Sequence, residues 1–581
     1  MRARCRANRA FLVLSLSISL LVLSASWTTA QQPPPQIRRV AEVVIQGNVL
    51  VPTATIRGVI STRVGEAFEE EKVRRDVQNI MDLGLFADVT VRIEEVRDGL
   101  RIIFIVLENP VVREVRVSGN TVIPTEEILK ALSVPVGEIL NTKTLSAGAR
   151  KVEKLYEDRG YVLARVADVS IDEQGRLSLV ISEGRLERVE FKGLVKTKEF
   201  VVQRELTIKS GDVFNVEAIN KDLRKLLELG YFESVRAQPS PGSTPDSVVL
   251  TIELVEQKTG EAKFGLGYSD RTGFVGSIEF GDRNFQGRGQ QLSLRLERGV
   301  TIGSFTAPTT PKLNYEITFR EPWFDAQRTF VELRTGQIFS LEREYGSGGV
   351  ITGEYELGRT GSSMTIGRPL DPLLTATLTI RSEQVTLDVL SGGVSLFTPG
   401  RTVSLALGAI RDARDNRFNP TSGERMALQA EIASSILGSD FSFVKSTAEY
   451  SRYVPMGKEA TLAARAMVGI SSGTLPLQDR FVLGGPLTLR GYPVGRLRAT
   501  SMGFMNVEYR VDLRSLSERL QDIQGVIYVD AGTAPLTGGP LDLLTNWGLA
   551  VSVKTPIGPI RIDYAVGREG SQTWLTIGHP F

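Results

Sequence analysis

The distribution of apolar and polar positions divides the chain into two parts. Before residue 257, segments in which apolar and polar residues alternate flank stretches with a helical period, for example 53–60 and 70–83. Gly84 follows the second stretch, which is typical of a helix C-terminus. From residue 258 onward the alternation continues in glycine-rich segments, and no helical period recurs. The pattern predicts small units of strands and helices, followed by a long all-β region.

The first part contains three copies of one pattern, with the order strand, helix, helix, strand, strand. A glycine after the first strand, a glycine after the second helix and a closing glutamate recur in every copy. They are Gly47, Gly119 and Gly193, then Gly84, Gly160 and Gly230, then Glu108, Glu183 and Glu256. Successive closing glutamates are 75 and 73 residues apart, so the copies are nearly equal in length. We expect domains at 38–109, 110–183 and 184–257, each a small α+β sheet that leaves an edge strand free.

The all-β region has the pattern of a membrane barrel. Alternation is cleanest in three segments: 505–512, 547–554 and 560–567. A soluble sandwich also alternates, but this chain closes on a strand with Leu575, Ile577 and the terminal Phe581 on one face. Such an ending resembles the C-terminal signature of bacterial outer-membrane barrels. At roughly 20 residues per strand and connection, residues 258–581 predict a transmembrane antiparallel β-barrel of about 16 strands.

The N-terminus has the pattern of an export signal. Four arginines precede an apolar run from Phe11 to Leu23, and small residues follow as far as Ala30. The run is shorter than the roughly 20 residues of a membrane-spanning helix, which favours a cleaved signal over a retained anchor. We expect a signal peptide at 1–30 and a linker at 31–37. Cys5 is the only cysteine, so the mature chain is expected to contain none.

The composition argues against most classes of enzyme. The chain has 69 Lys and Arg against 67 Asp and Glu, with one histidine and one cysteine. Zinc sites, cysteine nucleophiles and histidine-dependent triads need more of these residues. The sequence also lacks a Gly-x-Ser-x-Gly elbow and a phosphate-binding loop. We expect no catalytic residue, no metal and no cofactor, and the balanced charge argues against a nucleic-acid partner.

Both parts of the chain resemble one family. The landmarks of the three copies resemble the polypeptide-transport-associated (POTRA) domain. Segments of the barrel region resemble the superfamily of outer-membrane β-barrel assembly factors that includes BamA, TamA and the two-partner secretion transporters. These segments are the turns 281–289 (GDRNFQGRG), 320–324 (REPWF) and 412–416 (DARDN), the tip of the sixth extracellular loop at 484–492, and the strand motif 525–532. The resemblance implies three POTRA domains followed by a C-terminal surface-antigen barrel, and it covers essentially the whole mature chain.

The resemblance also implies a lock inside the barrel lumen. Its residues are Arg490, Gly491, Tyr492, Asp530 and Glu508. Arg490 lies between glycines that allow the loop to fold back, and alternation places Asp530 on the same face as Tyr528. A guanidinium can bind a carboxylate through two parallel hydrogen bonds. An isolated Arg-Gly-Tyr is more often a solvated loop, but the family pattern favours pairing of Arg490 with Asp530, which Glu508 joins.

Two pairs of residues suggest a weak seam between the first and last strands. Gly578 and Pro580 lie in the closing strand, where a missing side chain and a missing backbone donor weaken pairing. Gly265 and Gly267 lie in the expected first strand, 262–268. The alternative is an ordinary barrel with ordinary glycines. The resemblance favours a seam that opens sideways, because Gly578 falls where BamA-like proteins kink their last strand.

The expected function is insertion of client proteins into the outer membrane. POTRA edge strands would recruit unfolded β-barrel clients, and the seam would release them into the membrane without nucleotide. The expected location is the outer membrane, with the POTRA domains in the periplasm. Expected partners are client proteins and outer-membrane lipid, with accessory periplasmic subunits as further candidates. The alternatives are a TamA-like role for few clients, or a pore that secretes polypeptide; such pores carry two POTRA domains and usually an N-terminal plug helix.

Overall fold

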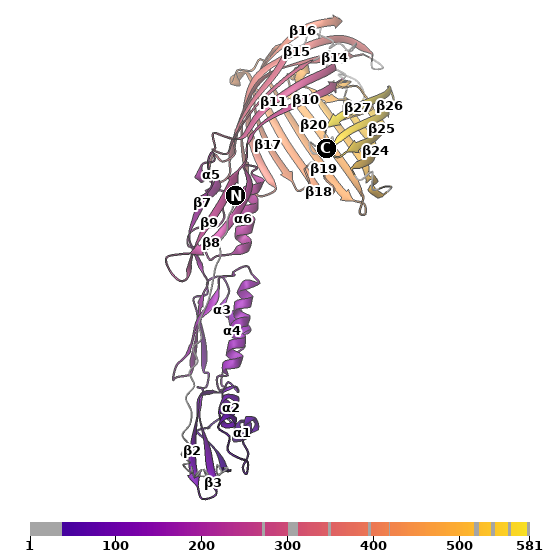
Figure 1. Cartoon of the computed structure of the whole chain (residues 1–581). Coiled ribbons are helices and arrows are strands. Elements are labelled where there is room, and N and C mark those ends of the chain that lie inside the picture. Colours follow the sequence, from indigo (N-terminus) through magenta and orange to yellow (C-terminus); the bar gives the residue numbers. More distant parts are fainter. Residues whose placement is uncertain are drawn as a thin grey trace, which may run out of the picture. The chain divides into compact units, whose positions relative to one another are not determined.

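The computed structural model describes residues 38–269, 273–299, 312–346, 350–392, 397–417, 419–515, 517, 522–535, 541–555 and 559–577. The expected signal peptide and linker lie outside these residues. The chain forms two compact units, one that ends at Gly184 and one that begins at Arg185 (Figure 1). The first unit holds two POTRA repeats. The second holds the third repeat and a large antiparallel sheet.

The three repeats share one topology. The first contains β1 (Val40–Gln46), α1 (Thr53–Val59), α2 (Glu70–Met81), β2 (Phe86–Val96) and β3 (Gly99–Glu108). The second contains β4 (Glu114–Ser118), α3 (Thr125–Leu132), α4 (Thr142–Glu157), β5 (Arg165–Ile171) and β6 (Arg176–Ser182). The third contains β7 (Arg185–Lys192), α5 (Glu199–Gln203), α6 (Val216–Glu228), β8 (Phe232–Pro241) and β9 (Ser247–Glu256). The predicted order of elements is confirmed.

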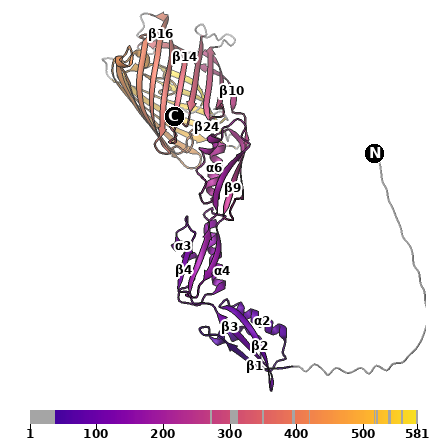
Figure 2. The same cartoon turned by 90° about the vertical axis from the view of Figure 1, so that its left-hand side faces the viewer.

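In each repeat the last strand occupies the middle of a three-stranded sheet. The sheet orders are β1-β3-β2, β4-β6-β5 and β7-β9-β8. The first strand runs parallel to the middle strand and the remaining strand runs antiparallel to it. The helices cover one face of each sheet (Figure 2). In the first repeat, Ile56 and Ile80 of the helices pack with Ile102 and Phe104 of the middle strand in a buried core.

The recurring glycines permit a close approach of two backbone segments. Gly47, Gly119 and Gly193 all have φ between +85° and +93°. A Cβ atom on any of them would lie 2.0 to 2.2 Å from a carbonyl oxygen of the middle strand. Because a positive φ and this lack of space both exclude other side chains, glycine is required at each of the three positions.

The closing glutamates hold the same turn from the other side. Glu108 accepts hydrogen bonds from the backbone N–H groups of residues 49–51 at 2.7 to 3.0 Å. Glu183 accepts hydrogen bonds from Thr121 N at 2.7 Å and from Val122 N at 3.1 Å. Glu256 accepts hydrogen bonds from the backbone N–H groups of residues 196 and 197. The spacing that marks the repeats in the sequence is therefore the spacing of a turn and its carboxylate partner.

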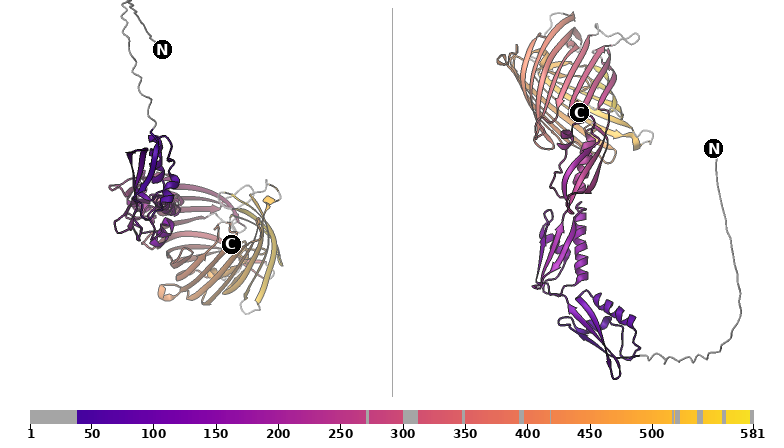
Figure 3. Two further views of the ribbon diagram at one scale, coloured as in Figure 1. Left: turned by 90° about the horizontal axis from the view of Figure 1, so that it is seen from below. Right: turned by 60° about the vertical axis from the view of Figure 1, so that its left-hand side comes forward.

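The second unit continues into a curved sheet. The strands are β10 (Gly260–Ser269), β11 (Gly273–Phe285), β12 (Gln290–Gly299), β13 (Leu313–Glu321), β14 (Phe330–Tyr345), β15 (Ile351–Pro369), β16 (Leu374–Gly392), β17 (Gly400–Asp412), β18 (Gly423–Ala433), β19 (Phe443–Pro455), β20 (Ala460–Gly473), β23 (Ser501–Asp512), β24 (Ile523–Pro535), β25 (Leu541–Val553), β26 (Ile560–Gly567) and β27 (Gly570–Ile577). These 16 strands, counted over the described residues, pair in this order and curl around a lumen (Figure 3). The prediction of about 16 antiparallel strands is confirmed.

The alternation in the sequence separates the two faces of the sheet. On β24, Val526, Tyr528 and Asp530 are buried, whereas Ile527 and Val529 are 59% and 54% exposed. Apolar residues thus face outward while polar side chains can enter the lumen, as expected for a barrel surrounded by lipid. Among the residues that the structure describes, no α-helix has both the length and the apolar character needed to cross a membrane.

We predict that Glu183→Gln destabilises the second repeat. Burial raises the pKa of Glu183, but hydrogen bonds from Thr121, Val122 and Tyr156 outweigh burial and hold this pKa below its usual value. Because the folded-state pKa is lowered, the stabilisation is present above the pKa of the unfolded chain. It is lost as the pH falls through the folded-state pKa. At pH 7 the loss should be about 1–3 kcal/mol, measured from urea unfolding followed by helical circular dichroism.

The control for this measurement is Glu157→Gln, at the end of α4, because Glu157 is exposed. It should unfold at the wild-type urea concentration. The difference between wild type and Glu183→Gln should shrink on acidification. Equal unfolding midpoints at pH 7 would contradict the role assigned to Glu183.

Candidate functional site

A long connection between β20 and β23 enters the lumen. Its two arms, β21 (Phe481–Leu483) and β22 (Leu497–Ala499), pair antiparallel and carry a tip at 484–496. Gly484 and Gly485 have φ of +105° and +101°, and a Cβ on Gly484 would lie 2.1 Å from the carbonyl oxygen of Pro493. The backbone N–H of Gly485 donates to Tyr492 O at 2.9 Å and to Leu489 O at 3.1 Å. The two glycines therefore allow the sharp turn that begins the tip.

The tip packs directly on the barrel wall. A Cβ on Gly491 would lie 2.5 Å from the Cβ of Asn546 on β25 and 2.9 Å from the backbone nitrogen of Gly567 on β26. The Tyr492 hydroxyl donates to the carbonyl oxygen of Thr545 at 3.0 Å, and the Tyr492 side chain is fully buried. Close contact of two backbones explains why a glycine follows the arginine of the tip.

Arg490 binds the wall through its whole guanidinium. Its Nε lies 2.9 Å from Asp530 Oδ2 and its Nη2 lies 2.5 Å from Asp530 Oδ1, a bidentate pair. Its Nη1 donates to Glu508 and lies 3.4 Å from Asp563 Oδ1. The Arg490 carbonyl oxygen also accepts a hydrogen bond from Trp574 Nε1 at 2.7 Å. The structure thus brings together Arg490, Asp530 and Glu508, the three charged residues singled out in the sequence.

Three further charged residues complete this cluster, and sequence reasoning missed them. Arg510 on β23 donates to Glu508 at 2.7 Å. Arg561 on β26 donates to Glu508 at 2.9 Å and to Asp563 at 2.7 Å. The sequence signal that could have identified them is the alternation of apolar and polar residues. Positions 508 and 510, and also 561 and 563, fall on the inward face of their strands.

The cluster is buried and balanced in charge. Arginines 490, 510 and 561 face three carboxylates, those of Glu508, Asp530 and Asp563, and all six side chains are at most 1% exposed. Asn506 and Asn546 each donate to Asp530 at 2.8 Å. A buried ion is tolerated when opposite charges and hydrogen bonds surround it. Removal of any one member leaves an uncompensated charge, so the cluster holds the tip as a unit.

An aromatic ring supports the arginine. The guanidinium carbon of Arg490 lies 3.4 Å from the centre of the Tyr528 ring, which is a cation–π contact. Tyr528 pairs with Gly548 across the β24–β25 ladder. A Cβ on Gly548 would lie 2.4 Å from the Tyr528 ring, so only glycine leaves room for the ring at this position.

The structure describes part of the predicted seam. Gly265 and Gly267 lie in β10, opposite Ser277 and Val275 of β11. Gly578, Pro580 and Phe581 lie outside the described residues. Leu575 faces outward on β27, and the backbone of Ile577 pairs with that of Ile560. Within the described residues, the sheet begins at β10 and ends at β27 without a ladder between these two strands.

The first two turn motifs join the third POTRA repeat to the barrel. A Cβ on Gly287 would lie 1.8 Å from the carbonyl oxygen of Lys196, and Lys198 N donates to Gly287 O at 2.8 Å. Trp323 Nε1 donates to Glu205 at 2.9 Å, between the β13–β14 turn and the repeat. These motifs are thus structural joints, and sequence reasoning missed the partners supplied by the repeat.

The third turn motif stabilises itself. Asp412 pairs with Arg414 at 2.8 Å, and Asp415 accepts hydrogen bonds from the backbone N–H groups of Thr421 and Ser422 at 3.0 and 3.1 Å. The two aspartates therefore hold a turn between β17 and β18.

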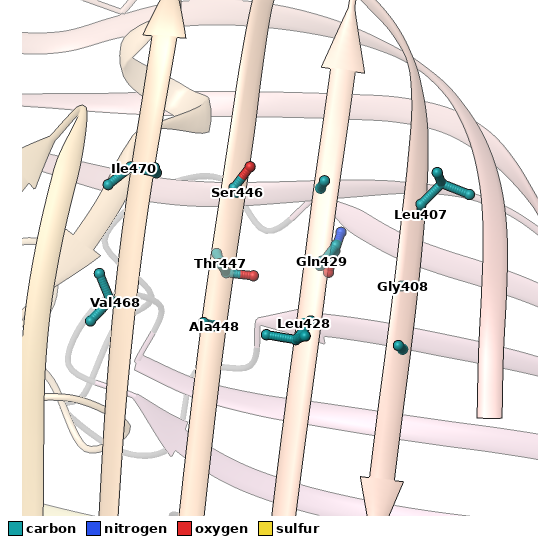
Figure 4. Close-up of a pocket in the computed structure, with 11 residues that line it drawn as sticks. Leu407, Gly408, Leu428, Gln429, Ser446, Thr447, Ala448, Val468 and Ile470 are labelled. Carbon is teal, nitrogen blue, oxygen red and sulfur yellow. The ribbon is translucent and has the colours of Figure 1, made fainter. Parts of the chain in front are cut away.

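The outward face of β17–β20 carries a shallow apolar groove of about 480 Å³. Leu407, Leu428, Val468 and Ile470 lie around it on neighbouring strands (Figure 4). Register pairs small residues with these larger ones, for example Ala448 with Leu428 and with Val468. This face presents hydrocarbon to its surroundings, as a lipid-facing barrel wall does.

We predict that Arg490→Ala and Asp530→Ala are strongly coupled. Each single change should lower the free energy of unfolding of the barrel in detergent by about 3–5 kcal/mol, because the other charge stays buried without its partner. The double variant should lose far less than the sum. Arg452→Ala is the control, because its ion pair with Glu424 is half exposed and should contribute less than about 1 kcal/mol. Additive losses at Arg490 and Asp530 would show that they do not act together.

Comparison with known proteins agrees with the fold. The model of the Omp85 superfamily domain matches residues 284–578, and the POTRA model, described as the surface antigen variable number repeat, matches 38–109, 110–184 and 185–257. Outer envelope protein 80 of Oryza sativa chloroplasts is 25% identical over 90% of this chain and 83% of its own length. Outer membrane protein assembly factor BamA of Nitratidesulfovibrio vulgaris is 24% identical over 89% of this chain and 68% of its own length.

A solved structure supports the same assignment. BamA from Haemophilus ducreyi without POTRA domains 1–3 superposes with a TM-score of 0.60 at 18% identity. The match covers 81% of this chain and all of that one, which shows a common fold. The family model of the barrel spans half of the chain and the repeat model covers the region before it. The chain is therefore a member of the Omp85 superfamily, with three POTRA repeats and a 16-stranded barrel.

Proposed function

We propose that this protein recruits unfolded β-barrel proteins through POTRA edge strands and inserts them into the outer membrane through the seam between β10 and β27, without nucleotide. The barrel belongs to the outer membrane and the POTRA repeats to the periplasm. The observation that carries the proposal is the pair of sheet ends, β10 and β27, which share no ladder among the described residues.

The seam offers a template for an incoming strand. Exposed backbone groups are not tolerated in hydrocarbon, so two unpaired barrel edges must pair with each other or with another strand. Gly578 and Pro580 are proposed to weaken the closing pair. A loss of a few backbone hydrogen bonds, roughly 2–4 kcal/mol, raises the open population by more than tenfold. A client strand can then pair with β10 as the client passes from the aqueous periplasm into the membrane.

The POTRA sheets offer the first contact. The strands β2, β5 and β8 each lie at a sheet edge, with one neighbour within the described part of the chain. An extended client can add to such an edge through main-chain hydrogen bonds, which tolerate many sequences. Other POTRA surfaces are proposed to receive accessory periplasmic subunits. The joint between the third repeat and the barrel, through Gly287 and Trp323, would keep recruitment close to the barrel.

The loop held inside the lumen favours a sideways route. The tip at 484–496 lies against β23–β26 and carries the arginine of a six-charge cluster, so a polypeptide cannot pass there without the loss of buried ion pairs. Outer-membrane lipid is the proposed partner of the apolar outer face. Work comes from binding and folding free energies, and the proposal involves no catalytic residue, metal or cofactor.

We predict that the reconstituted mature chain accelerates insertion of an unfolded outer-membrane protein into liposomes that contain no nucleotide. Folding of the client is measured as its gain of resistance to protease. Insertion no faster than in empty liposomes, combined with a large ion conductance, would favour a secretion pore instead. Faster insertion of autotransporter-like clients alone would favour a TamA-like role.

A cross-linked seam should abolish this activity. Cysteine pairs are placed in 262–268 and 573–579, which is feasible because Cys5 is the only native cysteine. Oxidation should stop insertion and reduction should restore it. A cysteine pair at Ala448 and Val468, partners in the β19–β20 ladder, is the control and should leave insertion unchanged. Full activity of the locked seam would exclude lateral opening.

A further inference from the structure

We propose that the connection between β20 and β23 has a second electrostatic anchor, Asp479, which holds the base of this connection against the barrel wall from β15 to β19. Asp479 ends the short helix η3 (Leu477–Asp479) and is 8% exposed. The inference goes beyond the proposed function, because it concerns how the loop is held, whatever the barrel inserts. Arg490 and Asp479 would then fix one segment at two separate points.

Asp479 meets cations from three strands. Its Oδ1 lies 3.7 Å from Nη1 of Arg359 on β15 and 3.7 Å from Nη1 of Arg381 on β16, both at ion-pair distance. Its backbone oxygen accepts a hydrogen bond from Nζ of Lys445 on β19 at 2.7 Å. Its Oδ2 accepts from the buried hydroxyl of Thr402 on β17 at 3.4 Å. The carboxylate thus contacts β15, β16 and β17, and the backbone of Asp479 contacts β19.

Neighbours of Asp479 anchor the same stretch by other forces. Leu477 packs in a buried cluster with Tyr355, Leu357 and Phe397. The carbonyl oxygen of Gln478 accepts from Arg359 Nη2 at 2.7 Å, and its side-chain amide bonds the backbone of residue 398. Apolar packing and backbone hydrogen bonds therefore place the carboxylate independently of the ion pairs.

The two walls carry opposite excess charge. Around Asp479, Arg359, Arg381 and Lys445 oppose Glu383 and Glu431, three positive groups against two negative ones. Around Arg490, Arg510 and Arg561 oppose Glu508, Asp530 and Asp563, two positive groups against three negative ones. In each case the loop supplies the missing charge. An excess charge is most costly around Arg490, where the cluster is buried, and less costly around Asp479, where Arg359 and Arg381 are about one quarter exposed. Each group of charges still favours the part of the loop that it contacts.

The two anchors contact different groups of strands in the sheet, with β20 between the groups. The first group of charges comes from β15 to β19, the second from β23 to β26. Two further ion pairs follow the same division: Arg498 on the returning arm pairs with Glu342 on β14, and Arg496 at the end of the tip bonds Glu569 beyond β26 at 2.7 Å. The loop therefore acts as a brace between two parts of the barrel wall, through ion pairs at its base and at its tip.

The test follows trypsin cleavage of the loop in the full-length protein in liposomes, since Arg480, Arg496 and Arg498 supply cleavage sites. Asp479→Asn should speed cleavage about tenfold, because the wall keeps its excess positive charge. Asp479→Glu keeps the negative charge and should be cleaved by trypsin at close to the wild-type rate. Asp388→Asn, at a carboxylate that is 66% exposed on β16, is the control and should cleave at the wild-type rate. Wild-type cleavage of Asp479→Asn would overturn the proposal.

A combined variant separates the two anchors. Asp479 and Arg490 share no partner in the described residues, so the effects of Asp479→Asn and Arg490→Ala on cleavage should multiply. This contrasts with the coupled pair Arg490 and Asp530. A double variant that cleaves no faster than Arg490→Ala alone would show that the base has no anchor of its own.

A cross-link keeps the proposal testable if Asp479→Asn does not fold. Cysteines at Thr398 and Gln478 should be joined by a short thiol cross-linker in the otherwise native barrel, and failure to join them would overturn the proposal. The insertion assay is run on the same samples. Normal insertion with faster cleavage supports the anchor and leaves the proposed function intact, whereas lost insertion with wild-type cleavage contradicts the anchor alone.

Discussion

The arrangement of the lumen depends on one constraint: a charged group removed from water needs an opposite charge beside it. Without Arg490, the wall from β23 to β26 would bury three carboxylates against two arginines. Because the guanidinium forms two bonds with Asp530 and another with Glu508, it fixes both the position and the orientation of the tip. The glycines around it serve this contact, since they bring the backbone of the loop within reach of the wall.

This constraint also bears on the route of a client. A loop held by buried charges fills part of the lumen, whereas β10 and β27 share no ladder in the described part of the barrel. Lipid does not tolerate unpaired backbone groups, which is the physical basis of the proposal that these edges receive a client strand. The proposed loop anchors and the proposed seam would be complementary: the anchors would keep the barrel wall in shape while the seam exchanges partners.

The three POTRA repeats hold the turn after their first strand by the same contacts. A glycine with positive φ lets the first turn touch the middle strand, and a glutamate at the end of that strand binds the N–H groups of the turn. The third repeat has an additional task. Its residues Lys196 and Glu205 meet the turns around Gly287 and Trp323, so the motifs of these turns belong to a joint.

The sequence by itself determined the local features of this protein. The inward position of Asp530 follows from a period of two residues, which its strand carries alone. The repeats follow from glycines and glutamates that recur at a fixed spacing, and the strand number follows from the length of the all-β region. The pairing of Arg490 with Asp530 came from family resemblance. The partners of Arg510, Arg561, Asp563 and Asp479 were decided only by the tertiary structure. Alternation says that a charge faces inward, but strand order and the path of a loop across the lumen decide which opposite charge it meets.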